Sequence, residues 1–255
     1  MHKTLLTQLN QFKSYGRKAF AVLLDPDYIS RNDLGPFLTR AEACEVDMLL
    51  LGGSLMVDGD IDEALRQLKS QTDIPVVLFP GSIQQISPEA DAILLLSLIS
   101  GRNPELLIGQ HVIAAPKLKN SGLEILPTGY MLIESGRTTT AHYVSNSLPI
   151  PYDKAEIAAC TAMAGEMLGL KLIYMDGGSG AEKSISSDMI AAVSKQVDVP
   201  LIIGGGIRTA EDASRIWDAG ADMIVIGNAL EKGESFELLE AVAYCKSGKN
   251  QKKAI

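Results

Sequence analysis

The sequence predicts an α/β fold, a (β/α)8 barrel, from three observations. Short unbroken apolar segments alternate with amphipathic segments along the whole chain. Eight strand–helix steps in 255 residues match the size of one such barrel. Polar or Gly-rich residues repeatedly follow the strands, as at a barrel mouth. A doubly wound parallel sheet is the alternative, but it rarely needs eight parallel strands. No composition shift marks a boundary, so residues 1–255 are expected to form a single domain.

The expected strands are short and rich in Leu, Ile and Val, as strands buried on both faces must be. In chain order they are residues 19–24, 48–51, 76–79, 92–96, a fifth at either 112–115 or 129–134, then 171–175, 201–203 and 223–226. Both candidates for the fifth strand are extended apolar runs, and the sequence leaves that choice open.

The helices expected between the strands are residues 32–44, 61–70, 154–168 and 236–245. Asn32 or Asp33 is expected to cap the first of them. Two regions fit a regular barrel poorly. Residues 80–91 leave little room for a helix and contain Ser87-Pro88, so we expect a modified barrel with helix 3 replaced by a loop. Residues 117–151, rich in turn signals, are expected to be an elaboration of the barrel.

The composition restricts the location and partners of the chain. A net charge of −8 argues against nucleic acid, which requires clustered positive charge. The cysteines Cys44, Cys160 and Cys245 are far apart, as expected of thiols in a reducing cytoplasm. No apolar run approaches 18 residues. The basic residues 246–253 are expected to form a solvated terminus, with peripheral membrane contact as the alternative.

Two Gly-rich strand ends near the C-terminus predict a phosphate site. The seventh strand ends in Gly204-Gly205-Gly206 and the eighth in Gly227-Asn228. Glycines let backbone N–H groups approach an anion, and the loops after strands 7 and 8 are the usual phosphate site of these barrels. A phosphorylated substrate is therefore expected, although glycines of this kind can also serve only to make tight turns.

The ends of the first two strands predict a divalent cation site. Asp25 follows the first strand, and Ser54 follows two glycines after the second. A carboxylate, a hydroxyl, phosphate oxygens and water are ligands that Mg²⁺ prefers. Asp25 could instead act as a base or as a turn residue. The isolated histidines, expected to be structural or exposed, give no sign of zinc; they are His2, His111 and His142.

The end of the sixth strand carries a further set of candidates. In Tyr174-Met175-Asp176-Gly177-Gly178-Ser179-Gly180, the carboxylate of Asp176 is expected to point to the mouth, and Ser179 can hydrogen-bond a phosphate. A flexible Gly-rich loop is the simpler interpretation. Tyr130 and Glu134 form a second candidate pair, and Glu134 could equally face solvent.

Taken in order, these motifs resemble those of the geranylgeranylglyceryl phosphate synthase family, and its second group most closely. The resemblance covers nearly the whole chain and rests on Leu24-Asp25-Pro26-Asp27, Leu51-Gly52-Gly53-Ser54, Tyr174-Met175-Asp176-Gly177-Gly178-Ser179-Gly180, Gly204-Gly205-Gly206-Ile207, Ile226-Gly227-Asn228, Ser100-Gly101-Arg102-Asn103-Pro104 and residues 129–151. Each glycine motif is weak alone, whereas the ordered set is specific.

The resemblance implies a Mg²⁺-dependent prenyltransferase that joins sn-glycerol 1-phosphate to a long prenyl diphosphate through an ether bond, with geranylgeranyl diphosphate expected as donor. It places Mg²⁺ at Asp25 and Ser54, with Asp25 and Asp176 as catalytic residues. It assigns the glycerol phosphate to Tyr174, Met175, Asp176, Gly177, Gly178, Ser179, Gly180, Gly205, Gly206, Gly227 and Asn228. It also implies a homo-oligomer, a dimer or a hexamer. Residues 93–98 and 106–108 are candidate walls for the prenyl tail.

The sequence departs from the family pattern at Asp176, where the family usually has Glu, and at Tyr28, where Lys often stands. Large aromatic residues that close the tail channel in relatives are not evident at 105–107. Two other functions therefore stay open. One is another phosphate-binding barrel enzyme, an isomerase or lyase. The other is a barrel that binds phosphate without catalysis, which the shorter Asp176 favours.

Overall fold

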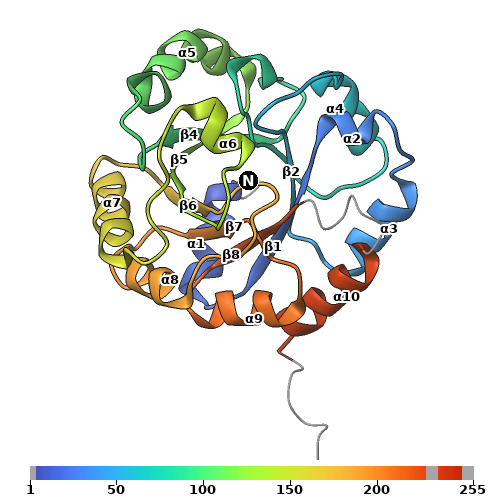
Figure 1. Ribbon diagram of the computed structural model, residues 1–255. Helices are drawn as coiled ribbons and strands as arrows, with labels where there is room; N and C mark the ends of the chain where they lie inside the picture. Colours follow the sequence, from blue (N-terminus) through green and yellow to red (C-terminus); the bar gives the residue numbers. More distant parts are fainter. Residues whose placement is uncertain (1–3, 228–234, 249–255) are drawn as a thin grey trace, which may run out of the picture.

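The computed structural model describes residues 4–227 and 235–248 and contains a closed barrel of eight parallel strands (Figure 1). The strands are β1 (Ala19–Leu24), β2 (Met48–Leu51), β3 (Val76–Leu78), β4 (Ala92–Leu98), β5 (Glu124–Leu132), β6 (Leu172–Asp176), β7 (Leu201–Gly204) and β8 (Met223–Ile226). Each strand pairs with its neighbours in sequence, and β1 pairs with β8 to close the barrel. The predicted barrel is confirmed.

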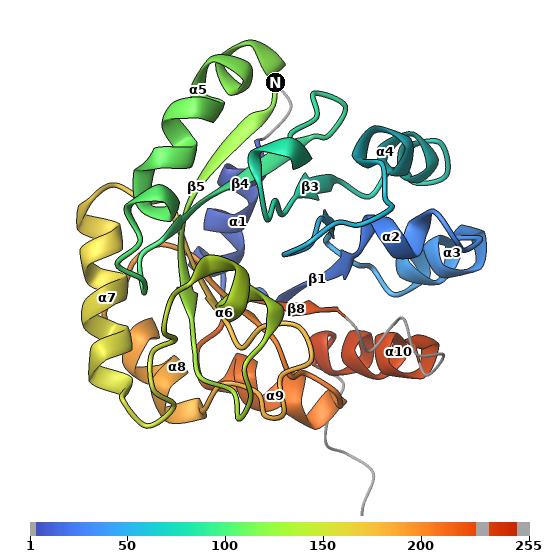
Figure 2. The same cartoon turned by 45° about the horizontal axis from the view of Figure 1, so that its top comes forward.

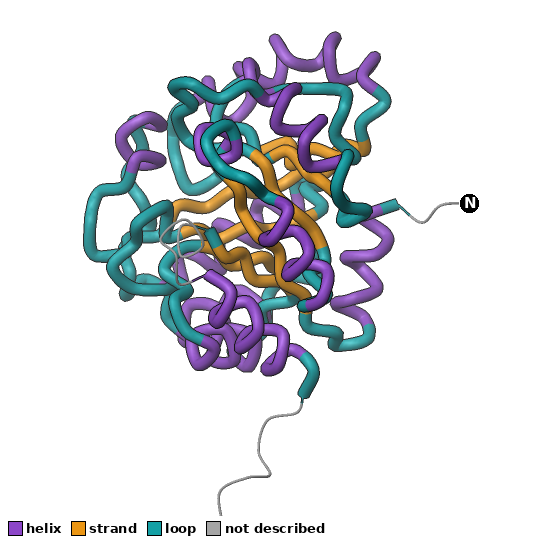
Figure 3. The backbone as a smooth tube through the Cα atoms, turned by 90° about the vertical axis from the view of Figure 1, so that its right-hand side faces the viewer, coloured by secondary structure: helices purple, strands orange, loops and turns teal. Residues whose placement is uncertain are grey.

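Helices surround the barrel (Figures 2 and 3). They are α1 (Leu5–Ser14), α2 (Pro26–Ile29), α3 (Gly35–Ala43), α4 (Ile61–Lys69), α5 (Gln110–Ser121), α6 (Thr140–Ser145), α7 (Ala155–Met167), α8 (Ser187–Ser194), α9 (Ala210–Asp218) and α10 (Ser235–Lys246), with a π-helical turn η2 (Glu105–Gly109) before α5. Between β3 and β4 the described chain contains only the short 3₁₀ turn η1 (Ile83–Gln85). The expected replacement of helix 3 by a loop is therefore confirmed.

Three expectations about individual elements need correction. The fifth strand begins at Glu124, and the rejected candidate, residues 112–115, is helical within α5. Pro127 and Gly129 inside β5 hid the start of the strand, because both residues usually argue against a strand. The elaboration is shorter than residues 117–151, since α5 and β5 belong to the barrel. Helix α3 begins at Gly35 and its N-cap is Leu34, so Asp33 lies one position before the cap. The Asp33 carboxylate nevertheless accepts the Gly35 N–H.

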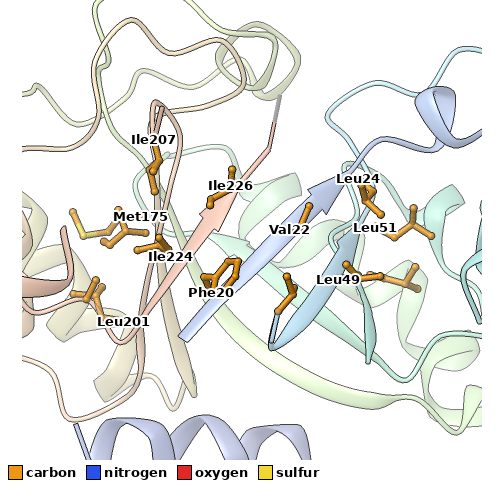
Figure 4. Packing of buried hydrophobic residues seen from close by; sticks show 14 of the residues in the cluster. Phe20, Val22, Leu24, Leu49, Leu51, Met175, Leu201, Ile207, Ile224 and Ile226 are labelled. Atoms are coloured by element: carbon orange, nitrogen blue, oxygen red, sulfur yellow. The ribbon is translucent and has the colours of Figure 1, made fainter. Parts of the chain in front are cut away.

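The core has two layers separated by the strands. Alternate strand residues point outward and pack under the helices, as Phe20, Val22 and Leu24 do in β1 (Figure 4). The residues between them fill the barrel, where they meet Leu9 and Phe12 of α1. Helix α1, which was not predicted, therefore closes the N-terminal end of the barrel. Glu124 fixes it there, because its carboxylate accepts the Leu5 and Leu6 N–H groups at 2.7 and 2.9 Å.

Carboxylates also join neighbouring strands at this closed end. Asp47, Asp91 and Asp222 each precede a strand and accept the first N–H groups of the strand beside it, at 2.8–3.0 Å. The Asp47 carboxylate also pairs with Arg17 and Lys246. These hydrogen bonds and ion pairs stabilise the closed end of the barrel, and the opposite end is left free for a site. No described helix combines the length and apolar character needed to cross a membrane.

Candidate active site

The β1 exit presents one carboxylate to the mouth and uses another to hold a loop. Asp25 caps α2, and its Oδ1 accepts the Asp27 N–H at 2.8 Å, while Oδ2 faces Gly53. Burial raises the pKa of Asp25, and the nearby charge of Asp27 adds to this. The Asp27 carboxylate accepts three backbone N–H groups from residues 57–59, which lower its pKa despite the opposing effect of burial. Asp25 is therefore the carboxylate that is open to a ligand.

The β2 and β3 exits are in direct backbone contact beside Asp25. A Cβ atom on Gly52 would lie 2.1 Å from the Phe79 carbonyl oxygen, and one on Gly81 would lie 2.2 Å from that of Gly53. Only glycine allows this approach, and Gly52 also has a φ of 150°. The contact holds Ser54 on the same cavity wall as Asp25. The structure therefore brings the two predicted metal ligands to one wall.

The β6 exit carries the second buried carboxylate. Asp176 accepts the Tyr130 hydroxyl at 2.5 Å and the Gly178 N–H at 2.7 Å. Burial raises the pKa of Asp176, and these two hydrogen bonds oppose the rise. Burial and the charge of Asp176 raise the pKa of Tyr130 well above its usual value, so the phenol stays protonated and donates. The pair therefore joins a carboxylate to a neutral hydrogen-bond donor in the mouth.

Aromatic packing holds this pair in place. The rings of Phe79 and Tyr174 stack with centroids 5.1 Å apart, and Tyr130 lies 5.8 and 5.6 Å from them. The Tyr174 hydroxyl lies against Gly204, where an added Cβ would be 2.4 Å away. Tyr174 therefore forms the floor of the mouth, while the Met175 side chain points outward into the layer under the helices (Figure 4). Met175 can contribute to the site through its backbone alone.

The glycines after β7 form the wall beside Asp176. Gly205 and Gly206 have φ values of 85° and 73°, and a Cβ on either would lie 2.7–2.8 Å from backbone atoms of the β6–α8 loop. Gly205 and Gly206 therefore do form tight turns, as the interpretation without a phosphate site expected, and they also pack closely against the neighbouring loop. Gly227 differs, because within the described part of the chain the nearest atom to an added Cβ is 3.7 Å away in Leu23. The space beside Gly227 is the cavity itself.

Two cavities meet at this mouth. One, of about 330 Å³, is lined by the glycines of the β6 and β7 exits together with Gly227, Ser179 and Arg208. The other, of about 280 Å³, contains Asp25 and Ser54 at one end. Both include Leu23, Asp176, Ser179 and Gly227 in their walls. The buried carboxylate of Asp176 therefore lies where the two cavities meet.

The second cavity continues as an apolar channel through the space that helix 3 would fill. Its walls come from η1, β4, η2, α5 and α6 and include Ile83, Ile86, Ile93, Leu95, Leu106 and Ala114. Of the predicted walls, residues 93–96, 98 and 106 line it, whereas Leu107 and Ile108 do not. His111 also lines the channel, and burial lowers its pKa, which favours the neutral ring. A long hydrocarbon chain suits such a channel.

The comparisons with known proteins agree with this geometry. The model of the PcrB family matches residues 13–245. The chain belongs to the PcrB family. Geranylgeranylglyceryl phosphate synthase from Chitinophaga pinensis is 54% identical over 95% of this chain and 97% of its own, and that from Spirosoma linguale is 56% identical over 89% and 91%. The synthase of Thermoplasma acidophilum, solved with sn-glycerol-1-phosphate, superposes with a TM-score of 0.85 at 33% identity and covers 94% of this chain and 97% of its own.

Membership of the PcrB family favours the synthase interpretation of the sequence and argues against the alternative of an isomerase or lyase. The site residues predicted from the sequence lie on two walls of one mouth: Asp25 and Ser54 on the first, and Asp176, Ser179, Gly205, Gly206 and Gly227 on the second. Gly177 is buried behind Ser135, and Gly178 and Gly180 line the second wall. Asn228 lies outside the described residues, as does His2. Glu134 accepts the Gly136 N–H and lies near Lys183, away from Asp176.

Sequence reasoning missed four residues at this PcrB-family site. Arg208 follows the β7 glycines and lines the glycine-lined cavity, and its guanidinium donates to the Ala181 and Glu182 carbonyls. Thr139 packs against Gly178, and His142 of α6 accepts the Thr139 N–H. Gln85 is buried in the loop that replaces helix 3. Only Arg208 carried a signal, a basic residue directly after a Gly-rich strand end.

Proposed function

We propose that this protein transfers a prenyl chain from a prenyl diphosphate to sn-glycerol 1-phosphate. The observation that carries the proposal is the meeting of a glycine-lined polar cavity and an apolar channel at one buried carboxylate, Asp176. The relatives' names support this pair of substrates and point to geranylgeranyl diphosphate as the donor. A barrel that binds phosphate without catalysis would have no need of the channel.

Mg²⁺ fits the first wall of the mouth. Asp25 offers one carboxylate oxygen in a partly buried position, and Ser54 offers a hydroxyl nearby. Among the described residues no set of three His, Cys, Asp or Glu side chains could hold a metal alone. One carboxylate completed by phosphate oxygens and water is a usual site for Mg²⁺. When bound, the cation supplies positive charge that stabilises the departing diphosphate.

The remaining steps belong to the residues of the chain. Backbone N–H groups of the β7 exit and Gly227 would hold the phosphate, with Arg208 at the rim. This placement aims the free primary hydroxyl at C1 of the prenyl chain. The C1–oxygen bond to the diphosphate breaks with its electron pair, and the hydroxyl oxygen forms the new ether bond. Asp176 accepts the hydroxyl proton, a role that its raised pKa suits.

The shorter side chain of Asp176 is compatible with this role. The hydrogen-bond partners of Asp176 among residues 4–227 and 235–248 include no second carboxylate. Instead, Tyr130 and Gly178 fix both of its oxygens, so that the carboxylate has one orientation. A rigid base can serve as well as a longer flexible one when the substrate is fixed relative to it.

The test is incubation of the purified protein with labelled sn-glycerol 1-phosphate and a series of prenyl diphosphates of increasing length, with Mg²⁺ or with excess chelator. We expect a Mg²⁺-dependent, solvent-extractable product that is largest with the geranylgeranyl donor. Asp25→Asn should abolish it without loss of glycerol-phosphate binding. Binding of glycerol phosphate with no product from any donor would refute the transfer and favour the non-catalytic barrel.

We also propose a cytoplasmic homo-oligomer, a dimer or a hexamer, with at most peripheral membrane contact. The exposed apolar residues Ile157, Met167 and Leu168 of α7 support an interface on that helix. Light scattering after gel filtration would give the number of subunits, and a monomer at micromolar concentration would refute this proposal.

A further inference from the structure

Gln85 is a buried polar residue that none of the steps above uses. It lies in the turn η1 that stands in place of helix 3, and only 2% of it is exposed, whereas the preceding Gln84 faces solvent. A buried amide is unfavourable unless its groups are hydrogen-bonded. A leucine or methionine would fill this volume without that requirement, so the amide points to a specific contact.

The Gln85 side chain joins the two loops that form the first wall of the mouth. Its Oε1 accepts the Gly81 N–H at 3.1 Å and the Gly53 N–H at 3.4 Å. Its Nε2 donates to the Gly53 carbonyl at 2.9 Å. One amide thus holds both polar groups of Gly53, the residue that faces the Asp25 carboxylate and precedes Ser54.

The same turn also forms part of the apolar channel. Ile83 and Ile86, on either side of Gln85, line the channel next to β4. Gln85 therefore connects the wall that would contact the hydrocarbon tail with the backbone beside the polar end of the same cavity. No corresponding connection reaches the glycine-lined cavity of about 330 Å³, the one proposed for glycerol phosphate, because residues 53 and 81 are not among its lining residues.

We propose that Gln85 is a positioning residue for the diphosphate end of the prenyl donor. It does not touch the reacting atoms. It fixes Gly53 and Ser54 relative to Asp25, so that the backbone and hydroxyl groups of this wall are in place before the donor arrives. This inference rests on the proposed function, since it assigns the Asp25–Ser54 wall to the diphosphate.

The test compares two variants with a matched control. Gln85→Met keeps the length of the side chain and removes all three hydrogen bonds. Gln85→Glu keeps the shape and the acceptor but places an oxygen against the Gly53 carbonyl. Gln84→Met is the control, because Gln84 is the exposed neighbour in the same turn. Calorimetric titrations with inorganic pyrophosphate plus Mg²⁺, and separately with glycerol 1-phosphate, report on the two walls independently of turnover.

We expect both Gln85 variants to bind pyrophosphate about tenfold more weakly, the effect of losing roughly one net hydrogen bond of positioning. KM for the prenyl diphosphate should rise in the same proportion, while the affinity for glycerol phosphate stays within about twofold of the wild type. The control should match the wild type in every measurement.

Equal weakening of both ligands, in step with a lower melting temperature, would overturn the inference and leave Gln85 a structural residue. Unchanged pyrophosphate affinity would also overturn it. If Gln85→Met does not fold, Gln85→Glu alone decides between these outcomes. Failure of the wild-type protein to transfer any prenyl chain is a different result, because it refutes the proposed function first.

Discussion

Removing the Tyr130 hydroxyl tests the assignment of Asp176 as the base. In Tyr130→Phe the ring keeps its place beside the stacked rings of Phe79 and Tyr174, whose centroids are 5.8 and 5.6 Å away, so the fold should persist. The change removes the hydroxyl that donates to Asp176 Oδ2 at 2.5 Å. A hydrogen bond to a charged group contributes about 1.5–3 kcal/mol, and this bond favours the ionised carboxylate.

The pKa of Asp176 should therefore rise further, since burial already raises it and one of the two opposing hydrogen bonds is lost. The acid limb of the pH–rate profile should move to higher pH. At a pH below the new limb, the rate should fall by about 10- to 100-fold, the equivalent of 1.5–3 kcal/mol, and it should largely recover above that limb.

Stability should change with pH in a defined direction. Because the pKa of Asp176 is raised in the folded protein, its contribution to stability is fully present below the unfolded pKa and is lost as the pH rises through the folded pKa. Tyr130→Phe should therefore destabilise the protein more at alkaline than at acidic pH, because it removes the hydrogen bond that supports the charged form.

The assay is initial-rate transfer of label from glycerol phosphate into extractable lipid across the pH range, at saturating donor. Melting temperatures at the same pH values control for unfolding. A uniform loss of rate at every pH, with no movement of the acid limb, would refute the role of Asp176 as the base that Tyr130 supports.

Three further predictions concern the binding walls and the closed end. Gly227→Val should fold normally, because an added Cβ meets no atom of the described residues closer than 3.7 Å, yet it should weaken glycerol-phosphate binding more than tenfold by filling the cavity; unchanged affinity in titration would contradict this. Asp25→Asn should make pyrophosphate binding insensitive to Mg²⁺, whereas persistent Mg²⁺ dependence in the same titration would place the metal elsewhere. Asp47→Ala should lower the free energy of unfolding by about 3 kcal/mol in urea, because it removes the carboxylate that pairs with the Lys246 charge and accepts the Phe20 N–H, while activity per folded molecule stays constant.

Much of the fold could be predicted because local and global signals agree in most of the chain. The strands other than β5 are mostly apolar runs, and the short segment between β3 and β4, interrupted by Ser87-Pro88, disfavours a regular helix there. The exception is β5, where Pro127 and Gly129 interrupt the apolar pattern. The apolar residues 112–115, which belong to α5, have the pattern of a strand and were the competing candidate. A short apolar run is compatible with either a helix or a strand, so only the tertiary packing could decide which of the two candidates is the fifth strand.

The site could be predicted in part. The order of residues along the chain places Asp25, Ser54, Asp176 and the later glycines at strand ends, and parallel strands carry all of these ends to one mouth. The structure then distinguishes residues that look alike in sequence. Asp25 faces the cavity, whereas Asp27 is occupied by three backbone N–H groups.

The sequence by itself determined the barrel, the Gly-rich strand ends and the family, because these depend on patterns within short segments and on their order. Only the tertiary structure decided the partners of Asp176, the position of Gln85 and the course of the apolar channel. Each of these depends on contacts between segments far apart in the chain, such as Tyr130 and Asp176, which are 46 positions apart. Such contacts leave no periodic signal in the sequence, because each of them is made by a single buried side chain.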